Sequence, residues 1–191
     1  MRKLEIPPAA AEYNEAGVVH GTQHRQHVDR SAQLGMAVEH VSDVDPVIEC
    51  LDETQTRKGL SITLGSKEIH TALDLLGPEN LRLYVCFDQQ GKAASSCVTL
   101  HAPGARAIGL VAGTKATGLA DGASHALWGG AFADLAAAGA TGIDFCEADV
   151  QSVAAFKCRW GSRLVPTYTV RDYSLRATAR FLSDWMVSRR L

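Results

Sequence analysis

The sequence is poor in aromatic residues, in proline and in long apolar runs, and it carries little net charge. Aromatic side chains make up 6% of its 191 residues, and six prolines stand against 17 glycines, which excludes collagen-like and proline-rich chains. No apolar run approaches the roughly 18 residues that span a bilayer, and the opening residues MRKLEIPPAAAEY lack the apolar core of a signal peptide. A net charge of −2 argues against a surface that binds nucleic acid or anionic lipid over its whole extent.

The cysteines are too scattered to form a framework. They number five, an odd count, and no two are spaced as C-x-x-C, so the sequence indicates neither a disulfide scaffold nor a zinc knuckle. Reduced thiols fit a reducing compartment best. We therefore expect a soluble protein of the cytoplasm. The cysteines are Cys50, Cys86, Cys97, Cys146 and Cys158.

The composition that remains is that of an ordinary globular protein, with 46% hydrophobic and 21% charged residues. The length suits one sizeable domain with a flanking arm. Because Pro7 and Pro8 interrupt any regular structure near the amino terminus, we assign residues 1–19 to a short strand and a linker. Residues 20–191 form the single predicted domain.

The first part of this domain has mainly helical periodicity. Apolar residues recur at helical spacing, and glycine follows each segment as a stop signal. A strand over 36–41 separates the first helix from the second, and Ser66 is the expected N-cap of the third. The predicted helices are 20–34, 43–58 and 66–76.

The middle of the chain changes to strand periodicity. Three runs rich in β-branched and aromatic residues, 81–87, 93–100 and 106–113, are joined by short connections that contain glycine. Such connections predict an antiparallel meander. A strongly apolar helix over 124–140 and a buried strand over 141–146 follow, so the last meander strand and this strand should lie parallel. The chain closes with a short helix, a strand over 163–173 and an amphipathic helix over 174–190.

This order of elements resembles the GNAT acyltransferase fold, and several residues resemble the carboxy-terminal domain of the Fem-type transferases and their BioF-like acetyltransferase relatives. The resemblance covers about residues 20–170. It implies an α/β (α+β) fold in which a mixed, mostly antiparallel, twisted sheet is flanked by helices. The matching positions are Gly139, Asp144, Phe145, Phe156, Lys157, Trp160, Gly161, Pro166 and Tyr168.

The resemblance implies an acyltransferase that moves an acyl or aminoacyl group from CoA or tRNA to an amine, with no tightly bound cofactor. Full members of the family carry two GNAT-like domains, so we expect a homodimer or a partner domain here. The partners expected are an acyl donor, an amine acceptor and tRNA. The alternative is a non-catalytic module that keeps the fold and serves assembly, and a weaker alternative is RNA binding through the arginines near the carboxy terminus.

In the implied fold, the parallel strand separates from its meander neighbour, and the donor binds where they part. Lys157 is the candidate stabiliser of the oxyanion by resemblance, and Asp144 or Glu147 is the candidate general base. The candidate donor-binding residues are Lys115, Gly118, Gly122, Ser124, Phe156, Arg159 and Arg163. The usual GNAT loop Q/R-x-x-G-x-G/A, which holds a pyrophosphate on backbone N–H groups, has no clean match in TKATGLADGASHALW.

Each of these residues also has a structural interpretation. The segment FKCRWG is equally typical of an amphipathic helix end, with the aromatic residues packed inward and the cations in solvent. An acidic residue between a strand and a helix often caps the helix, and Asp149 suits that role. His20, His24 and His27 share one helical face, where a solvated surface is favoured over a metal site, so no metal is expected.

Overall fold

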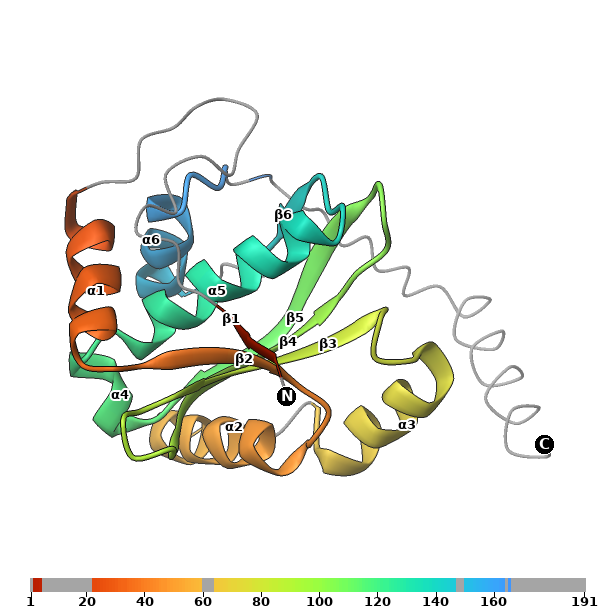
Figure 1. Cartoon of the computed structure of the whole chain (residues 1–191), viewed down its shortest axis with the longest axis horizontal. Coiled ribbons are helices and arrows are strands. Elements are labelled where there is room, and N and C mark those ends of the chain that lie inside the picture. The colour runs from red at the N-terminus through yellow and green to blue at the C-terminus, as the bar shows by residue number, and fades with distance from the viewer. Residues whose placement is uncertain (1, 5–21, 60–63, 147–149, 164, 166–191) are drawn as a thin grey trace, which may run out of the picture.

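In the computed structural model, the antiparallel meander forms the centre of a sheet that has six strands in the described part of the chain, in the order β1-β2-β3-β4-β5-β6 (Figure 1). The structure describes residues 2–4, 22–59, 64–146, 150–163 and 165. All neighbouring strands run antiparallel except β5 and β6, which are parallel as the sequence predicts. The strands are β1 (Arg2–Leu4), β2 (Ala37–Val41), β3 (Leu81–Phe87), β4 (Ala93–Leu100), β5 (Arg106–Thr114) and β6 (Gly142–Asp144).

Helices cover both faces of the sheet. Figure 1 shows α2 and α3 on one face and α1, α5 and α6 on the other. The short helix α4 connects β5 to α5. The helices are α1 (Thr22–Gln33), α2 (Asp45–Lys58), α3 (Ser66–Leu76), α4 (Ala116–Ala120), α5 (Ala123–Ala137) and α6 (Gln151–Arg159).

The sheet divides the apolar core into two clusters because neighbouring residues of a strand point to opposite faces. On β3, Tyr84 and Cys86 belong to the cluster beneath α1 and α5, whereas Leu83 and Val85 belong to the cluster beneath α2 and α3. All four side chains are fully buried. The alternation explains why β3 reads as a continuous apolar run.

Most predicted elements of the described part of the chain are confirmed within one or two residues. The helix predicted over 124–140 ends three residues early, at Ala137, and two other details are wrong. Ser66 is the first residue of α3 and not its N-cap; the N-cap is Gly65, whose N–H donates to the Glu68 carboxylate. The strand expected over 141–146 is shorter and less buried than predicted, since β6 ends at Asp144 and its residues are half-buried or exposed. The linker, the predicted strand 163–173 (apart from Arg163 and Val165) and the final helix 174–190 lie outside the described residues.

Candidate functional site

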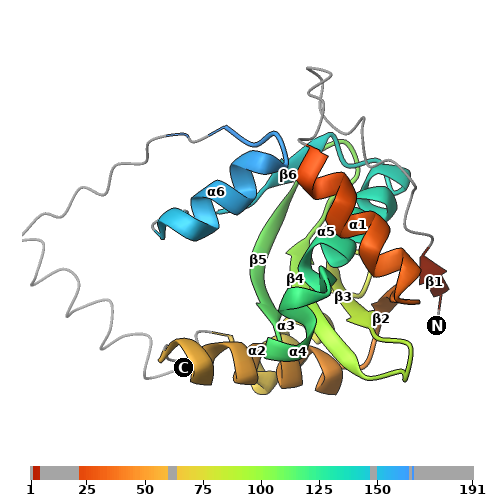
Figure 2. The same ribbon diagram turned by 90° about the vertical axis from the view of Figure 1, so that its left-hand side faces the viewer.

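The strands β5 and β6 pair over only a short distance. Their register joins Arg106 to Gly142, Ala107 to Ile143 and Ile108 to Asp144. β5 continues to Thr114, so its residues 109–114 have no partner in β6. Figure 2 shows β6 and α6 beside the first part of β5 and α2 beside its far end. Backbone pairing of the two parallel strands therefore ends at Ile108 and Asp144, near the place where the resemblance puts their separation.

Two features accompany the point where the strands part. The pairing of β4 with β5 shifts register between Val98 and Thr99, so that Leu110 is an extra residue in β5, and such a bulge bends the strand. The Trp128 ring of α5 lies against Gly109, where an added Cβ would come within 3.1 Å of it. The same ring packs edge-on against Phe145, just after β6, with centroids 4.9 Å apart. Aromatic side chains thus occupy the place where backbone pairing ends.

Lys157 lies on α6 next to this point. Its Nζ donates a hydrogen bond of 2.6 Å to the backbone carbonyl of Phe145, and it stands 6.0 Å from the centroid of the Phe145 ring. Phe156 is half-buried against the α5 side of the core, and Trp160, which ends α6, is buried. Lys157 therefore points toward the end of β6, whereas Phe156 packs against His125 of α5.

Of the two candidate bases, Asp144 and Glu147, the structure describes only Asp144. The Asp144 carboxylate is exposed and accepts a hydrogen bond of 2.7 Å from the Cys146 N–H, so it stabilises the turn that follows β6. Cys146 has a left-handed backbone with φ of 55°. Glu147 and Asp149 lie outside the described residues. Since Asp144 already makes a local hydrogen bond in an exposed position, its role as a base remains a prediction.

The predicted donor-binding residues fall into two groups. Phe156, Arg159 and Arg163 lie on or just after α6, and both arginines are exposed. The others lie between β5 and the start of α5. Lys115, Gly118 and Gly122 are buried there, and Ser124 is half-buried.

The two glycines of this segment pack closely against neighbouring backbone. A Cβ on Gly118 would lie 2.9 Å from the Ala94 carbonyl oxygen, and one on Gly122 would lie 2.7 Å from the His27 carbonyl oxygen in α1. Gly122 also has φ of 79°, a conformation that glycine adopts without strain. Both glycines are therefore required by packing, whatever they do for a donor.

A set of polar residues on α2 was not predicted as part of the site. Glu49, Glu53, Thr54 and Arg57 follow one face of the helix at helical spacing, and all four contact residues 114–116, where β5 leads into α4. The sequence shows these polar residues along one face of α2. It does not show what they contact, because their hydrogen-bond partners lie 57 to 66 residues further along the chain.

A second unpredicted group lies beneath α5. The Asp134 carboxylate accepts hydrogen bonds from Arg82, at 2.5 Å, and from the Tyr84 hydroxyl, at 2.9 Å. Burial and the Asp134 charge raise the pKa of Tyr84 well above its ordinary value. Two features of the sequence could have indicated this ion pair: an arginine inside the apolar run LRLYVCF, and a single acidic residue inside the apolar helix α5. The group ties α5 to β3.

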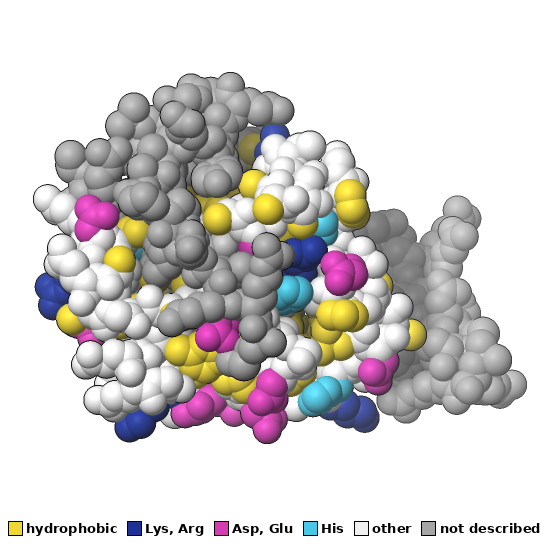
Figure 3. All heavy atoms as spheres, in the orientation of Figure 1, with side chains coloured by type: hydrophobic (Ala, Val, Ile, Leu, Met, Phe, Trp, Pro, Cys, Tyr) yellow, Lys and Arg dark blue, Asp and Glu magenta, His cyan; other side chains and the backbone are white. Residues whose placement is uncertain are grey.

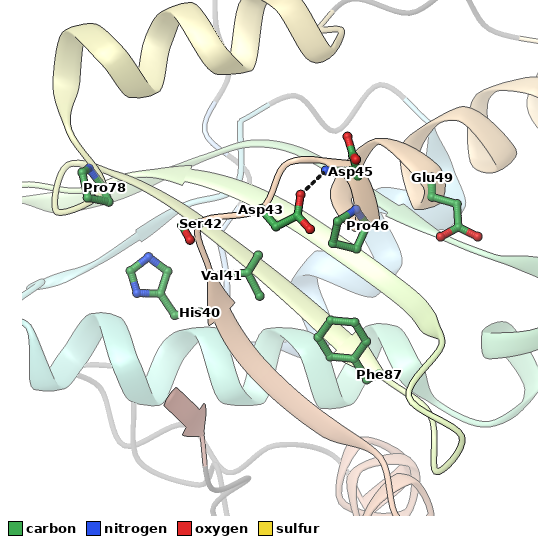
Figure 4. Close-up of a pocket in the computed structure, with 9 residues that line it drawn as sticks. All are labelled: His40, Val41, Ser42, Asp43, Asp45, Pro46, Glu49, Pro78 and Phe87. Atoms are coloured by element: carbon green, nitrogen blue, oxygen red, sulfur yellow. Dashed lines mark hydrogen bonds between the residues drawn. The ribbon is translucent and has the colours of Figure 1, made fainter. Parts of the chain in front are cut away.

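The hollow shown in Figure 4 lies at the other side of the sheet, where β2 leads into α2. It has a volume of about 860 Å³, and Asp43 within it accepts a hydrogen bond from the Asp45 N–H at the start of α2. In the strand order, β3, β4 and β5 separate β2 from β6, so this hollow is remote from Lys157. Its lining residues are His40, Val41, Ser42, Asp43, Asp45, Pro46, Glu49, Pro78 and Phe87.

Of the three histidines expected on one face of α1, His27 is the one whose side chain the structure describes. The His27 ring stacks on His125 of α5, with centroids 4.4 Å apart. Among the described residues, no group of three or more His, Cys, Asp or Glu side chains could hold a metal ion. His20 lies outside those residues.

In the described part of the chain, no helix is long and apolar enough to cross a membrane.

The fold is shared with several solved structures. FemX aligns with a TM-score of 0.64 and 15% identity, over 74% of this chain and 54% of FemX. The C-terminal domain of a protein described as a lysylphosphatidylglycerol synthetase, from Agrobacterium fabrum, aligns with a TM-score of 0.59 and 16% identity, over 84% and 56%. An aminoglycoside acetyltransferase from an uncultured soil metagenomic sample aligns with a TM-score of 0.55 and 12% identity, over 73% and 95%.

These similarities confirm the GNAT-type fold, including its likeness to FemX. This chain spans about half the length of the FemX and synthetase chains that it matches. No protein-family model matches the sequence, and no curated protein matches it significantly.

Proposed function

We propose that this domain is an acyltransferase that moves an acyl or aminoacyl group from a thioester or ester donor to an amine. The observation that carries the proposal is that the pairing of β5 with β6 ends after three residues, with Lys157 beside the end of β6. An extended donor arm can hydrogen-bond to a strand edge that has lost its neighbour, as a peptide does in β-strand addition. Ile108 and Leu110 of β5, which are 37% and 40% exposed, offer apolar contacts to such an arm.

The reaction that we propose is a direct transfer. The amine nitrogen attacks the acyl carbon, a C–N bond forms, and the C–S bond of CoA or the C–O bond of an aminoacyl ester breaks. The amine proton passes to a base, and the thiol or hydroxyl leaves. Such a transfer depends on holding both reactants together and on stabilising negative charge at the carbonyl oxygen.

The predicted residues receive the following roles. Lys157 supplies positive charge at the end of β6, where it also fixes the Phe145 carbonyl. Asp144, the acidic group at the end of β6 in the described chain, or Glu147 accepts the proton. Phe156 shapes the site, and Arg159 and Arg163 provide a positive field for a donor that carries phosphates.

The donor classes are acyl-CoA and aminoacyl-tRNA, and we place the reaction in the cytoplasm, where both are found. The protein is proposed to act as a homodimer. Multi-angle light scattering tests this point directly: we expect twice the chain mass, and a strict monomer would contradict it.

Replacing Lys157 tests the catalytic assignment. In Lys157→Ala we expect kcat to fall by about 10²-fold or more, the loss seen when one oxyanion-stabilising donor is removed. The fold should be intact by circular dichroism. Lys67→Ala, which removes an exposed lysine from α3, is the matched control and should retain full activity. Wild-type turnover in Lys157→Ala would remove the assignment.

Donor binding separates an enzyme from a non-catalytic module. A donor present at 100 times its dissociation constant should stabilise the native state by about 2.7 kcal/mol, which a thermal-shift assay detects. We expect a shift with acetyl-CoA, a longer acyl-CoA or aminoacyl-tRNA. If none of them shifts the melting temperature and none supports transfer, the domain is a module.

A further inference from the structure

The junction between β5 and α4 is held by side chains from α2. Thr54 Oγ1 accepts a hydrogen bond of 2.8 Å from the Thr114 N–H and donates one of 2.9 Å to the Thr114 carbonyl, which also accepts one of 2.9 Å from Arg57. The Glu53 carboxylate accepts a hydrogen bond of 2.7 Å from the Ala116 N–H. We call residues 114–116 together with Glu49, Glu53, Thr54 and Arg57 the junction clamp.

The clamp also neutralises a nearly buried lysine. The Lys115 side chain is 11% exposed, and its Nζ pairs with the Glu49 carboxylate at 2.5 Å. A nearly buried ammonium needs an anion or several acceptors beside it. Here the chain supplies that anion itself, and the charges of Lys115 and Arg57 are matched by those of Glu49 and Glu53.

A lysine and an N–H group at the start of a helical turn are the groups to which a phosphate ordinarily binds. In this structure both groups already hold carboxylates. The same helix also carries Asp45 and Asp52, and Figure 3 shows acidic side chains along the edge of the molecule where α2 lies. A phosphate at the junction would have to displace Glu53 or stand beside two carboxylates of like charge.

The junction cannot move away from these carboxylates easily. Gly113 packs directly on α2, where an added Cβ would lie 2.6 Å from the Cys50 carbonyl oxygen. The Ser95 hydroxyl hydrogen-bonds to the Gly113 carbonyl at 3.0 Å and to the Thr114 hydroxyl at 2.8 Å. Strand, junction and α2 therefore form one tightly packed unit.

We propose that Glu53, with Glu49, is a specificity determinant that excludes phosphate from the junction. A donor is then recognised through its acyl-bearing arm at the separated strands, and any phosphate it carries is bound elsewhere. This inference rests on the proposed acyltransferase function. It narrows the donors to those that can bind without a phosphate at the junction. It also removes Lys115 from the predicted phosphate-binding residues.

Calorimetric titration with inorganic pyrophosphate tests the exclusion without requiring turnover. We expect no binding to the wild type at millimolar pyrophosphate. In the double variant Glu49→Gln with Glu53→Ala, we expect affinity to rise by roughly tenfold or more, the factor that one hydrogen bond to a charged group is worth. Adding Lys115→Met should abolish the gain. Asp52→Asn removes a charge from the same helix without touching the clamp and should gain nothing.

Two results would overturn the proposal. One is wild-type binding of pyrophosphate or acetyl-CoA that weakens tenfold or more in Lys115→Met, because the junction would then be a phosphate site already. The other is a folded double variant with no gain. If the double variant does not fold, Glu53→Gln, which keeps an oxygen for the Ala116 N–H, replaces it under the same criterion. Absence of acyl transfer would contradict the proposed function, but it would not change the outcome of these binding measurements.

Discussion

At the scale of single residues, the most consequential side chains are the ionised groups that the fold buries. Arg82 and Asp134 have side chains only 9% and 11% exposed, and each is the main charge partner of the other. Removing one partner leaves the other charge buried and unpaired. This lowers the free energy of unfolding much more than the loss of an exposed ion pair does.

We therefore expect Asp134→Ala to lower the free energy of unfolding by about 3–5 kcal/mol, measured by urea denaturation. Glu79→Ala removes the other carboxylate near Arg82, but the Glu79 side chain is 84% exposed, and the expected loss is about 0–1 kcal/mol. The double replacement Arg82→Met with Asp134→Leu should cost less than Asp134→Ala alone. Equal losses in the Asp134 and Glu79 variants would show that the buried pair does not matter.

His40 makes stability depend on pH. Burial lowers its pKa below the ordinary value of 6.5, an effect that exceeds the opposite influence of Asp134. The unfolded chain then binds a proton at this residue more readily than the folded chain does. The stabilising contribution is present above the ordinary pKa and is lost as the pH falls through the lowered one.

We expect the free energy of unfolding to decrease between pH 7.5 and pH 5, and His40→Asn to reduce that decrease. His70→Asn, at an exposed position on α3, is the control and should leave the pH dependence unchanged. Urea titrations at several pH values measure both. A decrease of the same size in His40→Asn would contradict the assignment.

At the scale of elements, α5 approaches the sheet so closely that a single methyl group matters. A Cβ on Gly130 would lie 2.7 Å from two atoms of the Val38 side chain, whereas a Cβ on the neighbouring Gly129 would have only Trp160 within 4 Å, at 3.9 Å. The two glycines share a helix and differ only in the face that they present.

We expect Gly129→Ala to stabilise the protein by about 0.5–1 kcal/mol, because alanine is the better helix former. Gly130→Ala should instead destabilise it by about 1–3 kcal/mol through overpacking. Denaturation midpoints of the two variants give the comparison. Stabilisation by both replacements would show that α5 can move away from β2 at little cost.

The elements themselves were largely predictable because their signals are local. The helix over 66–76 and the meander follow from apolar period and glycine position, which neighbouring residues determine. The parallel pairing of β5 with β6 follows from the order of strand, helix and strand, and the resemblance supplied the expected separation of these strands. The junction clamp could not be predicted, since each of its contacts joins residues more than 50 positions apart. The place of Lys157 was predicted by resemblance, and its bond to the Phe145 carbonyl was not.

At the scale of the whole molecule, the sheet separates two apolar clusters that share no side chain. Val28 of α1 lies in one and Val47 of α2 in the other, and both are buried. Distant positions without shared partners usually contribute independently to stability.

We expect Val28→Ala and Val47→Ala each to cost about 1.5–3 kcal/mol. The double variant should cost the sum of the two within about 0.5 kcal/mol, as measured by urea denaturation. A departure of more than about 1 kcal/mol would mean that the sheet transmits strain between its faces.

The left-handed backbone at Cys146 has a consequence for how the chain can vary at the end of β6. A residue with a side chain pays about 1–2 kcal/mol for this mirror-image conformation, and glycine does not. The turn is instead specified by the Asp144 carboxylate and the Lys157 ammonium, which bond to the N–H and the C=O of the single peptide group that joins Phe145 to Cys146. Selection among variants at position 146 should thus enrich glycine and asparagine. The sulfur of Cys146 would not be needed to form the turn.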